Sequence, residues 1–101
     1  MLIKHAATAG TLESSDAMVT IEPGAAGIEI SLDSPVIHQF GRQIRRVALE
    51  ELARLGIEAA RLTIVDKGAL DCTLRARIEC AAYRAADGAQ GPISWGGGSE
   101  P

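Results

Sequence analysis

The feature that most constrains the fold is a long amphipathic segment in the middle of the chain. From Pro35 to Leu55, apolar residues recur at intervals of one, three or four positions, the spacing of one face of an α-helix. We expect Ser34 to cap this helix and Gly56 to end it. Its apolar stripe consists of Ile37, Phe40, Ile44, Val47, Ala48, Leu52 and Leu55. A helix with one apolar face must bury that face against another element.

Strand patterns lie on both sides of this helix. Segments 18–22 and 28–32 alternate apolar and polar residues, and 61–65 also reads as a strand. The first two are separated by a short turn, so we expect them in an antiparallel pair or triplet. The polar cluster Glu13-Ser-Ser-Asp16 predicts a hairpin with Ser14 and Ser15 at or near its tip. Residues 1–10 fit a short strand or an irregular lead-in.

The segment 69–86 fits both periods. Alternate positions from Leu74 to Cys80 are apolar, as in a strand, but Leu70 and Ala82 extend a series at i,i+4. Length and Ala, Arg and Glu content favour the helix without excluding the strand. We predict an α+β fold, in which a small, mainly antiparallel sheet of about four strands is covered on one face by two helices. Residues 1–86 form the domain, and the glycine-rich residues 87–101 form a flexible tail.

Composition argues against several classes of partner. The net charge of −3 provides no basic surface for nucleic acid, and the arginine clusters have Glu residues nearby, which favours salt-bridged helix faces. No segment reaches the roughly 20 apolar residues of a membrane-spanning helix, and no signal peptide is evident. Aromatic residues make up only 3% of the chain, too few for a deep ring-lined pocket. We expect a cytoplasmic protein with neither nucleic acid nor membrane as a partner.

No group of residues has the pattern of a catalytic or metal centre. His5 and His38 are the two histidines, and His38 is expected to be solvated in the first turn of the main helix. Cys72 and Cys80 lack CxxC spacing and a neighbouring histidine, so we expect buried, reduced thiols. We therefore predict no catalytic residue and no metal ligand.

Serines beside aspartates remain as candidate sites. Asp33-Ser34 before a helix is similar to the Asp-Ser-Leu site of phosphopantetheine-dependent acyl carrier proteins. Pro35 replaces the leucine, however, and strands precede Ser34 where that all-helical family has a helix. Helix capping is thus the better interpretation of Ser34. From the residues alone, Ser14 and Ser15 are ordinary turn residues.

Two short motifs resemble those of the acyl carrier (gamma) subunit of citrate lyase. One is Ala9-Gly-Thr-Leu-Glu-Ser-Ser-Asp16 followed by Met18-Val, and the other is Asp66-Lys-Gly-Ala-Leu-Asp-Cys72 followed by Leu74-Arg-Ala-Arg77. Their order and spacing agree with that family, as does the intervening Gln39-Phe-Gly41. The resemblance covers about residues 1–86.

The resemblance implies that Ser14 carries a 2'-(5''-phosphoribosyl)-3'-dephospho-CoA group through a phosphodiester. It implies that this arm shuttles acetyl and citryl thioesters between the transferase (alpha) and lyase (beta) subunits, which cleave citrate to oxaloacetate and acetate. A separate prosthetic-group transferase would attach the arm, and the carrier would not be catalytic alone. Glu13 and Asp16 would guide that enzyme or cap the turn.

Two alternatives to the citrate lyase carrier remain at this point. One is the related carrier of malonate decarboxylase, which uses the same type of group. The stretch from Asp66 to Asp71 favours citrate lyase over it. The other is a non-catalytic interaction domain, in which Ser14 is an ordinary turn residue.

Overall fold

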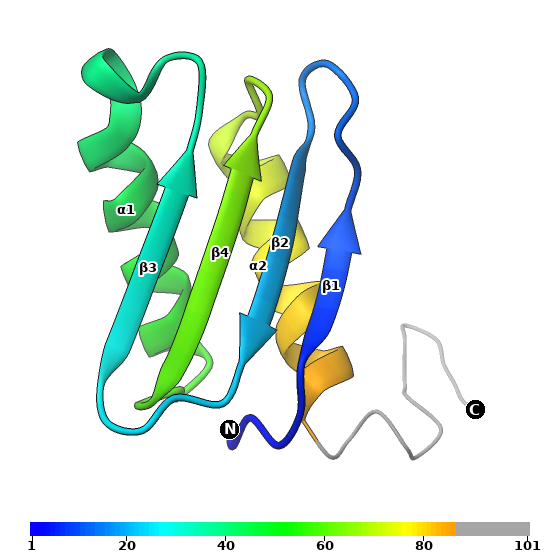
Figure 1. Cartoon of the computed structure of the whole chain (residues 1–101), viewed down its shortest axis with the longest axis vertical. Helices are drawn as coiled ribbons and strands as arrows, with labels where there is room; N and C mark the ends of the chain where they lie inside the picture. Colours follow the sequence, from blue (N-terminus) through cyan, green and yellow to red (C-terminus); the bar gives the residue numbers. More distant parts are fainter. Residues whose placement is uncertain (87–101) are drawn as a thin grey trace.

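The computed structural model describes residues 1–86, which form one sheet with two helices on one of its faces (Figure 1). The elements are β1 (Ala7–Gly10), β2 (Ala17–Glu22), β3 (Ile28–Asp33), α1 (Ile37–Arg54), β4 (Ala60–Asp66) and α2 (Asp71–Ala85). The predicted α+β class, with four strands and two helices, is confirmed. The predicted flexible tail, 87–101, lies outside the described residues.

The order of the strands in the sheet is β1-β2-β4-β3. β1 and β2 form an antiparallel hairpin, β2 is antiparallel to β4, and β3 is parallel to β4. The expected direct pairing of segments 18–22 and 28–32 is therefore wrong, because β4 lies between them. Every second residue of β4 is buried, whereas β3 has no fully buried residue. The more apolar strand takes the central position, and α1 provides the crossover that a parallel pair requires.

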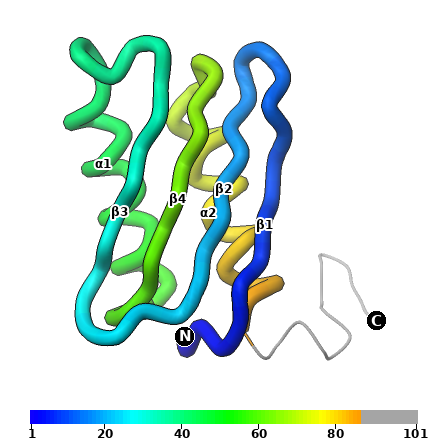
Figure 2. The backbone as a smooth tube through the Cα atoms, viewed as in Figure 1, coloured from blue at the N-terminus to red at the C-terminus, as the bar shows by residue number. Residues whose placement is uncertain are grey.

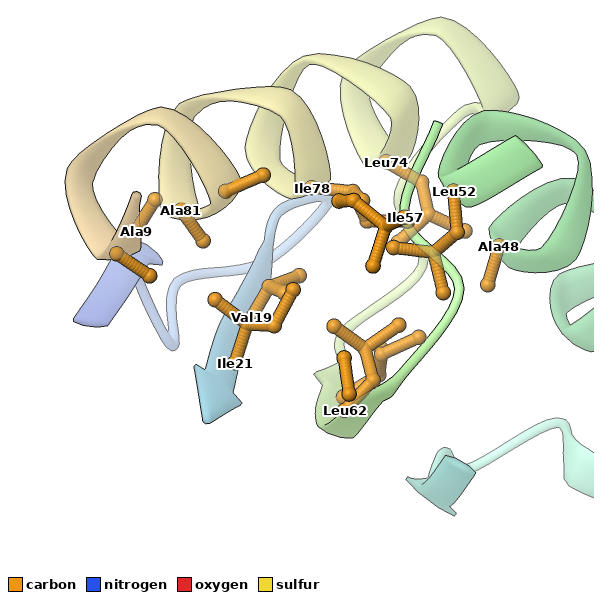
Figure 3. Packing of buried hydrophobic residues seen from close by; sticks show 14 of the residues in the cluster. Ala9, Val19, Ile21, Ala48, Leu52, Ile57, Leu62, Leu74, Ile78 and Ala81 are labelled. Atoms are coloured by element: carbon orange, nitrogen blue, oxygen red, sulfur yellow. The ribbon is translucent and has the colours of Figure 1, made fainter. Parts of the chain in front are cut away.

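The core is aliphatic and lies between the sheet and the two helices. In Figure 3, Val19 and Ile21 of β2 and Leu62 of β4 lie on the face of the sheet that the helices cover. They belong to one core cluster with Leu52 of α1 and Ile78 of α2. The largest fully buried apolar side chains are Ile21, Leu52, Leu62, Ile64, Leu74, Ile78, Val19 and Val47. This packing fixes both helices against one face of the sheet.

Helix α1 begins two residues later and ends one residue earlier than predicted, and the predicted stop at Gly56 is confirmed. Gly56 has a φ of +71° and donates to the Ala53 carbonyl at 3.0 Å, while Ile57 donates to the Leu52 carbonyl at 2.9 Å. These two bonds form the Schellman motif that commonly ends helices at glycine.

The predicted inward position of Phe40 is wrong, since this side chain is 48% exposed. Gly41 faces the sheet instead. A Cβ atom at Gly41 would lie 3.0 Å from Cγ1 of Ile37 and 3.8 Å from Cδ2 of Leu32. The helix therefore approaches β3 closely at a residue that a count of apolar side chains leaves out.

The segment 69–86 forms the helix α2, as its composition favoured. The expectation of two buried thiols is wrong for Cys72, which is exposed in the first turn, whereas Cys80 is half-buried. Neither described helix has the length and hydropathy needed to cross a membrane.

Ion pairs join the two helices on the outer surface. Arg75 of α2 lies 2.7 Å from Glu50 of α1. Glu51, which is only 2% exposed, pairs with Arg54 and lies 3.7 Å from Arg75. The predicted salt-bridged helix face is thus confirmed for Arg75, whereas Arg77 of the same group pairs with Asp16 of the β1–β2 hairpin.

Three loops meet at one end of the molecule, where β1, β3 and β4 end (Figure 2). They are 11–16 between β1 and β2, 34–36 between β3 and α1, and 67–70 between β4 and α2. The N-terminus lies at the opposite end (Figure 1).

Candidate functional site

Ser14 and Ser15 occupy the tip of the β1–β2 hairpin, as predicted. The Asp16 N–H donates to the Glu13 carbonyl at 3.1 Å and closes the turn. Ser15 has a φ of +68°, a region that residues with side chains rarely adopt, and as the third residue of the turn it fits type II. Ser14 beside it is exposed. A strained conformation of this kind persists only where the surrounding structure enforces it.

The Asp16 carboxylate anchors this turn to the body of the protein. Arg77 of α2 donates from Nε to Oδ1 and from Nη2 to Oδ2, each at 2.9 Å. The Thr11 hydroxyl donates to Oδ2 at 2.6 Å, and the Ala17 N–H donates to Oδ1 at 2.7 Å. These bonds, above all those from Arg77, hold the pKa of Asp16 well below its usual range. Of the two roles considered for Asp16, stabilising the turn is the one that these contacts establish.

The β4–α2 loop contacts the same turn through the backbone. The Lys67 carbonyl accepts from the Ser15 N–H at 2.7 Å, and the Lys67 N–H donates to the Asp16 carbonyl at 2.8 Å. The two motifs noted in the sequence therefore form one structural unit, although Asp16 and Arg77 are 61 positions apart. Sequence reasoning missed the roles of Lys67 and Arg77. Their presence in the second motif was the signal that could have indicated them.

Ser34 is only 7% exposed. Its hydroxyl donates to Oδ2 of Asp66 at 2.9 Å and accepts from the Val36 N–H at 3.2 Å. Asp66, itself 2% exposed, also accepts from the Ala69 N–H at 2.9 Å. The predicted helix cap at Ser34 and the place of Pro35 in the first turn are wrong, because the N-cap position is Val36. The hydroxyl instead stabilises the turn before the helix, since it reaches a carboxyl group on a neighbouring strand.

An open groove of about 480 Å³ lies between α1 and the β4–α2 loop. It is lined by Val36, Phe40, Gln43, Ile44, Asp66, Gly68, Ala69, Leu70 and Asp71. Phe40 and Leu70 are exposed, and so is Leu12 in the β1–β2 loop. The end of the molecule that carries Ser14 thus also carries several exposed large apolar side chains.

No group of His, Cys, Asp and Glu residues within 1–86 could hold a metal ion. His38 is exposed in the first turn of α1, as expected. At this end of the described chain, Ser14 is an exposed hydroxyl on a turn that Asp16 and Lys67 support.

Comparisons with known proteins agree on one class. The family model described as malonate decarboxylase delta subunit (MdcD), an acyl carrier protein, matches residues 4–85. The citrate lyase acyl carrier protein of Lacticaseibacillus casei (strain BL23) is 56% identical over 87 residues, which cover 86% of this chain and 86% of that protein. The protein of that description from Rhodopseudomonas palustris (strain BisA53) is 55% identical over 87 residues, 86% of this chain and 90% of its own. That of Klebsiella pneumoniae is 53% identical over 96 residues, 94% and 97% of the two chains.

A small α+β domain that presents an exposed serine on a supported turn, and that matches these sequences over most of its length, is an acyl carrier protein. Within that class, the chain belongs to the family of the citrate lyase acyl carrier proteins. The resemblance inferred from the two motifs is confirmed.

Proposed function

We propose that this protein is the acyl carrier subunit of citrate lyase and that Ser14 is the residue to which its prosthetic group is attached. The observation that carries the proposal is the exposed Ser14 hydroxyl on a turn held by Asp16, Arg77 and Lys67. Relatives that are 53–56% identical to this chain and are described as citrate lyase acyl carrier proteins support it.

The residues around Ser14 fit a group linked by a phosphodiester. A serine must be accessible to be modified, and Ser14 is exposed whereas Ser34 is buried and hydrogen-bonded. The site must also tolerate a negative charge. The Asp16 carboxylate is already paired with Arg77, and the exposed cation Lys67 lies across the turn. The proposed group is 2'-(5''-phosphoribosyl)-3'-dephospho-CoA.

The role of this chain is to hold the arm and to deliver it. When attached, the group supplies a terminal thiol that carries acyl groups as thioesters. A tethered thiol reaches its active sites at an effective concentration set by the arm rather than by bulk solution. Because Arg77 and Lys67 fix the turn, the base of the arm stays in place while the arm itself moves. The proposed partners are the alpha and beta subunits of citrate lyase and the transferase that attaches the group.

A second candidate is the carrier of malonate decarboxylase. The observation that favours it is the description of the matching family model, which is the malonate decarboxylase delta subunit. This candidate uses the same type of group on the same serine. The two therefore differ in their partner subunits rather than in the site.

The site is tested by intact-mass and peptide mass analysis of the chain purified from its native host. We expect a mass gain equal to the proposed group on the peptide that contains Ser14. The gain should be absent in Ser14→Ala and present in Ser15→Ala. An unmodified chain in cells with active citrate lyase would refute the proposal. A gain that survives Ser14→Ala but is lost in Ser15→Ala would move the site by one residue.

The complex is tested by purifying the subunits that accompany a tagged chain. We expect them to cleave citrate to oxaloacetate and acetate, and we expect no cleavage with the Ser14→Ala chain. A preparation that decarboxylates malonate and does not cleave citrate would establish the second candidate.

A further inference from the structure

Lys67 is a charged residue beside the turn whose side chain is left unpaired by the described residues. It follows β4 directly, and its backbone bonds to both Ser15 and Asp16 hold it against the tip of the β1–β2 hairpin. Its side chain is exposed. Among residues 1–86 that side chain has neither a hydrogen-bond nor an ion-pair partner.

Lys67 is bonded to the residue that directly follows Ser14. The N–H that donates to the Lys67 carbonyl belongs to the peptide group joining Ser14 to Ser15, and the donor and acceptor atoms are 2.7 Å apart. Ser14 is thus one residue away from the backbone partner of Lys67. A lysine ammonium sits on a long flexible stem and binds phosphate as a mobile point charge.

Two other charged side chains near the turn, Asp16 and Arg84, already have hydrogen-bond partners of their own. The Asp16 carboxylate accepts two bonds from Arg77 and two more from Thr11 and Ala17. Arg84, which also contacts the hairpin, donates to the Thr8 carbonyl at 2.8 Å.

Glu13 is the remaining charged residue of the turn. Its carboxylate is exposed and forms no ion pair with Lys67 or with any other residue of 1–86.

We propose that Lys67 is the positioning residue that pairs with the phosphodiester on Ser14 and so holds the base of the arm against the β4–α2 loop. This inference rests on the proposed function, because it assumes a phosphodiester at Ser14. It adds a cationic partner for that group within this chain. The pair lies at the surface, so its effect is modest and depends on salt.

Amine labelling tests the pairing directly. The chain has two lysines, Lys67 and Lys4. Lys4 serves as an internal reference because it is three residues from the N-terminus, which lies at the opposite end of the molecule from the turn (Figure 1). Modified and unmodified full-length chains are treated with a reductive methylation reagent, and the rate at each lysine is followed by peptide mass analysis. In low salt we expect Lys67 to react about two- to fivefold more slowly in the modified chain. The rate at Lys4 should not change.

Salt and free phosphate distinguish an ion pair from steric protection and from a general anion site. The protection of Lys67 should largely disappear in about 1 M salt, where the screening length is only about 3 Å. Protection that persists there is steric, and it would overturn the pairing. Inorganic phosphate added to the unmodified chain should not protect Lys67. Protection by free phosphate would show an anion site that does not need the tether, and would overturn the positioning role.

Two variants provide a second, structural readout. Lys67 supports the turn through its backbone alone, so Lys67→Gln and Lys67→Arg should both fold as the wild type does. In the modified chain, Lys67→Gln should move the ³¹P resonance of the phosphodiester toward its position in the urea-unfolded chain. Lys67→Arg should leave it near the wild-type position, because the cation is retained. A resonance that is unchanged in Lys67→Gln would overturn the inference.

The failure of this inference can be told from failure of the proposed function. If Ser14 is modified but Lys67 is equally reactive in both chains, only the role of Lys67 is wrong. If no arm is found on Ser14, the proposed function fails and the inference fails with it.

Discussion

Replacing Ser34 with alanine should destabilise the protein without preventing the modification of Ser14. The Ser34 hydroxyl donates to the carboxyl group of Asp66, which is 2% exposed, and accepts from the Val36 N–H. In Ser34→Ala the carboxyl group loses one bond and retains the one from Ala69. The Val36 N–H loses its acceptor. The Ser34 and Asp66 side chains are 7% and 2% exposed, so water does not easily replace the bond between them.

The expected loss follows from these contacts. A hydrogen bond to a charged group contributes about 1.5–3 kcal/mol, and a buried polar group left without a partner costs about 1–3 kcal/mol. Because Asp66 keeps its second donor, we expect the free energy of unfolding to fall by about 2 kcal/mol. For a domain of this size each 1 kcal/mol lowers Tm by about 4–8 °C, so Tm should fall by about 8–16 °C.

Urea unfolding followed by circular dichroism measures this change, with calorimetry for Tm. Ser31→Ala is the matched control, because Ser31 lies exposed on β3 and its loss should change the free energy by no more than about 0.5 kcal/mol. Mass analysis of the same Ser34→Ala chain should still show the group on Ser14. A Ser34→Ala chain as stable as Ser31→Ala, or one that lacks the modification while folded, would refute the reasoning.

Three other substitutions test the supports of the turn and the core. Arg77 lowers the pKa of Asp16 in the folded protein. The Asp16 carboxylate therefore stabilises the fold fully above its ordinary pKa of 3.8, and this stabilisation is lost as the pH falls from 3.8 through the lower pKa of the folded protein. Asp16→Asn should be less stable than wild type at pH 7 in urea unfolding, by a difference that shrinks below pH 3.8. Gly10→Ala should lower the free energy of unfolding by more than about 1 kcal/mol, because Gly10 has a φ of +97° and a Cβ there would lie 1.9 Å from the Ala17 carbonyl oxygen. Ile78→Ala should lower it by about 2–5 kcal/mol, since the side chain is completely buried.

Each of these substitutions has an outcome that would contradict it, and two have a control in the same chain. A loss of stability in Asp16→Asn that stays constant with pH would contradict the pairing of Asp16 with Arg77. Gly27 has a φ of +74° but open space around it, so Gly27→Ala isolates the cost of conformation from that of the clash. Gly10→Ala should lower the free energy of unfolding more than Gly27→Ala does. Leu49→Ala is the control for Ile78→Ala, because Leu49 is exposed on α1. If Ile78→Ala lowers the free energy of unfolding no more than Leu49→Ala does, the burial of Ile78 in the core is contradicted.

The sequence predicted the turn of the candidate site but not the residues that hold that turn in place. A polar cluster between two strand patterns predicted the hairpin tip, because turn-forming residues act locally. The contacts that hold the tip come from 61 positions away at Arg77 and from Lys67. No local pattern specifies whether β2 pairs with β4 or with β3. In the structure β2 pairs with β4, and this pairing brings Lys67, which follows β4, to the turn.

By itself, the sequence determined the elements and where the chain turns. Periodicity predicted the helix over 35–55 and the strands, and Gly56 marked the end of that helix, because these features depend on neighbouring residues alone. Strand order and burial were decided by the tertiary structure, since they depend on which distant segments pack together. Ser34 is buried and bonded to Asp66, 32 positions away, whereas Ser14, the proposed attachment residue, is exposed.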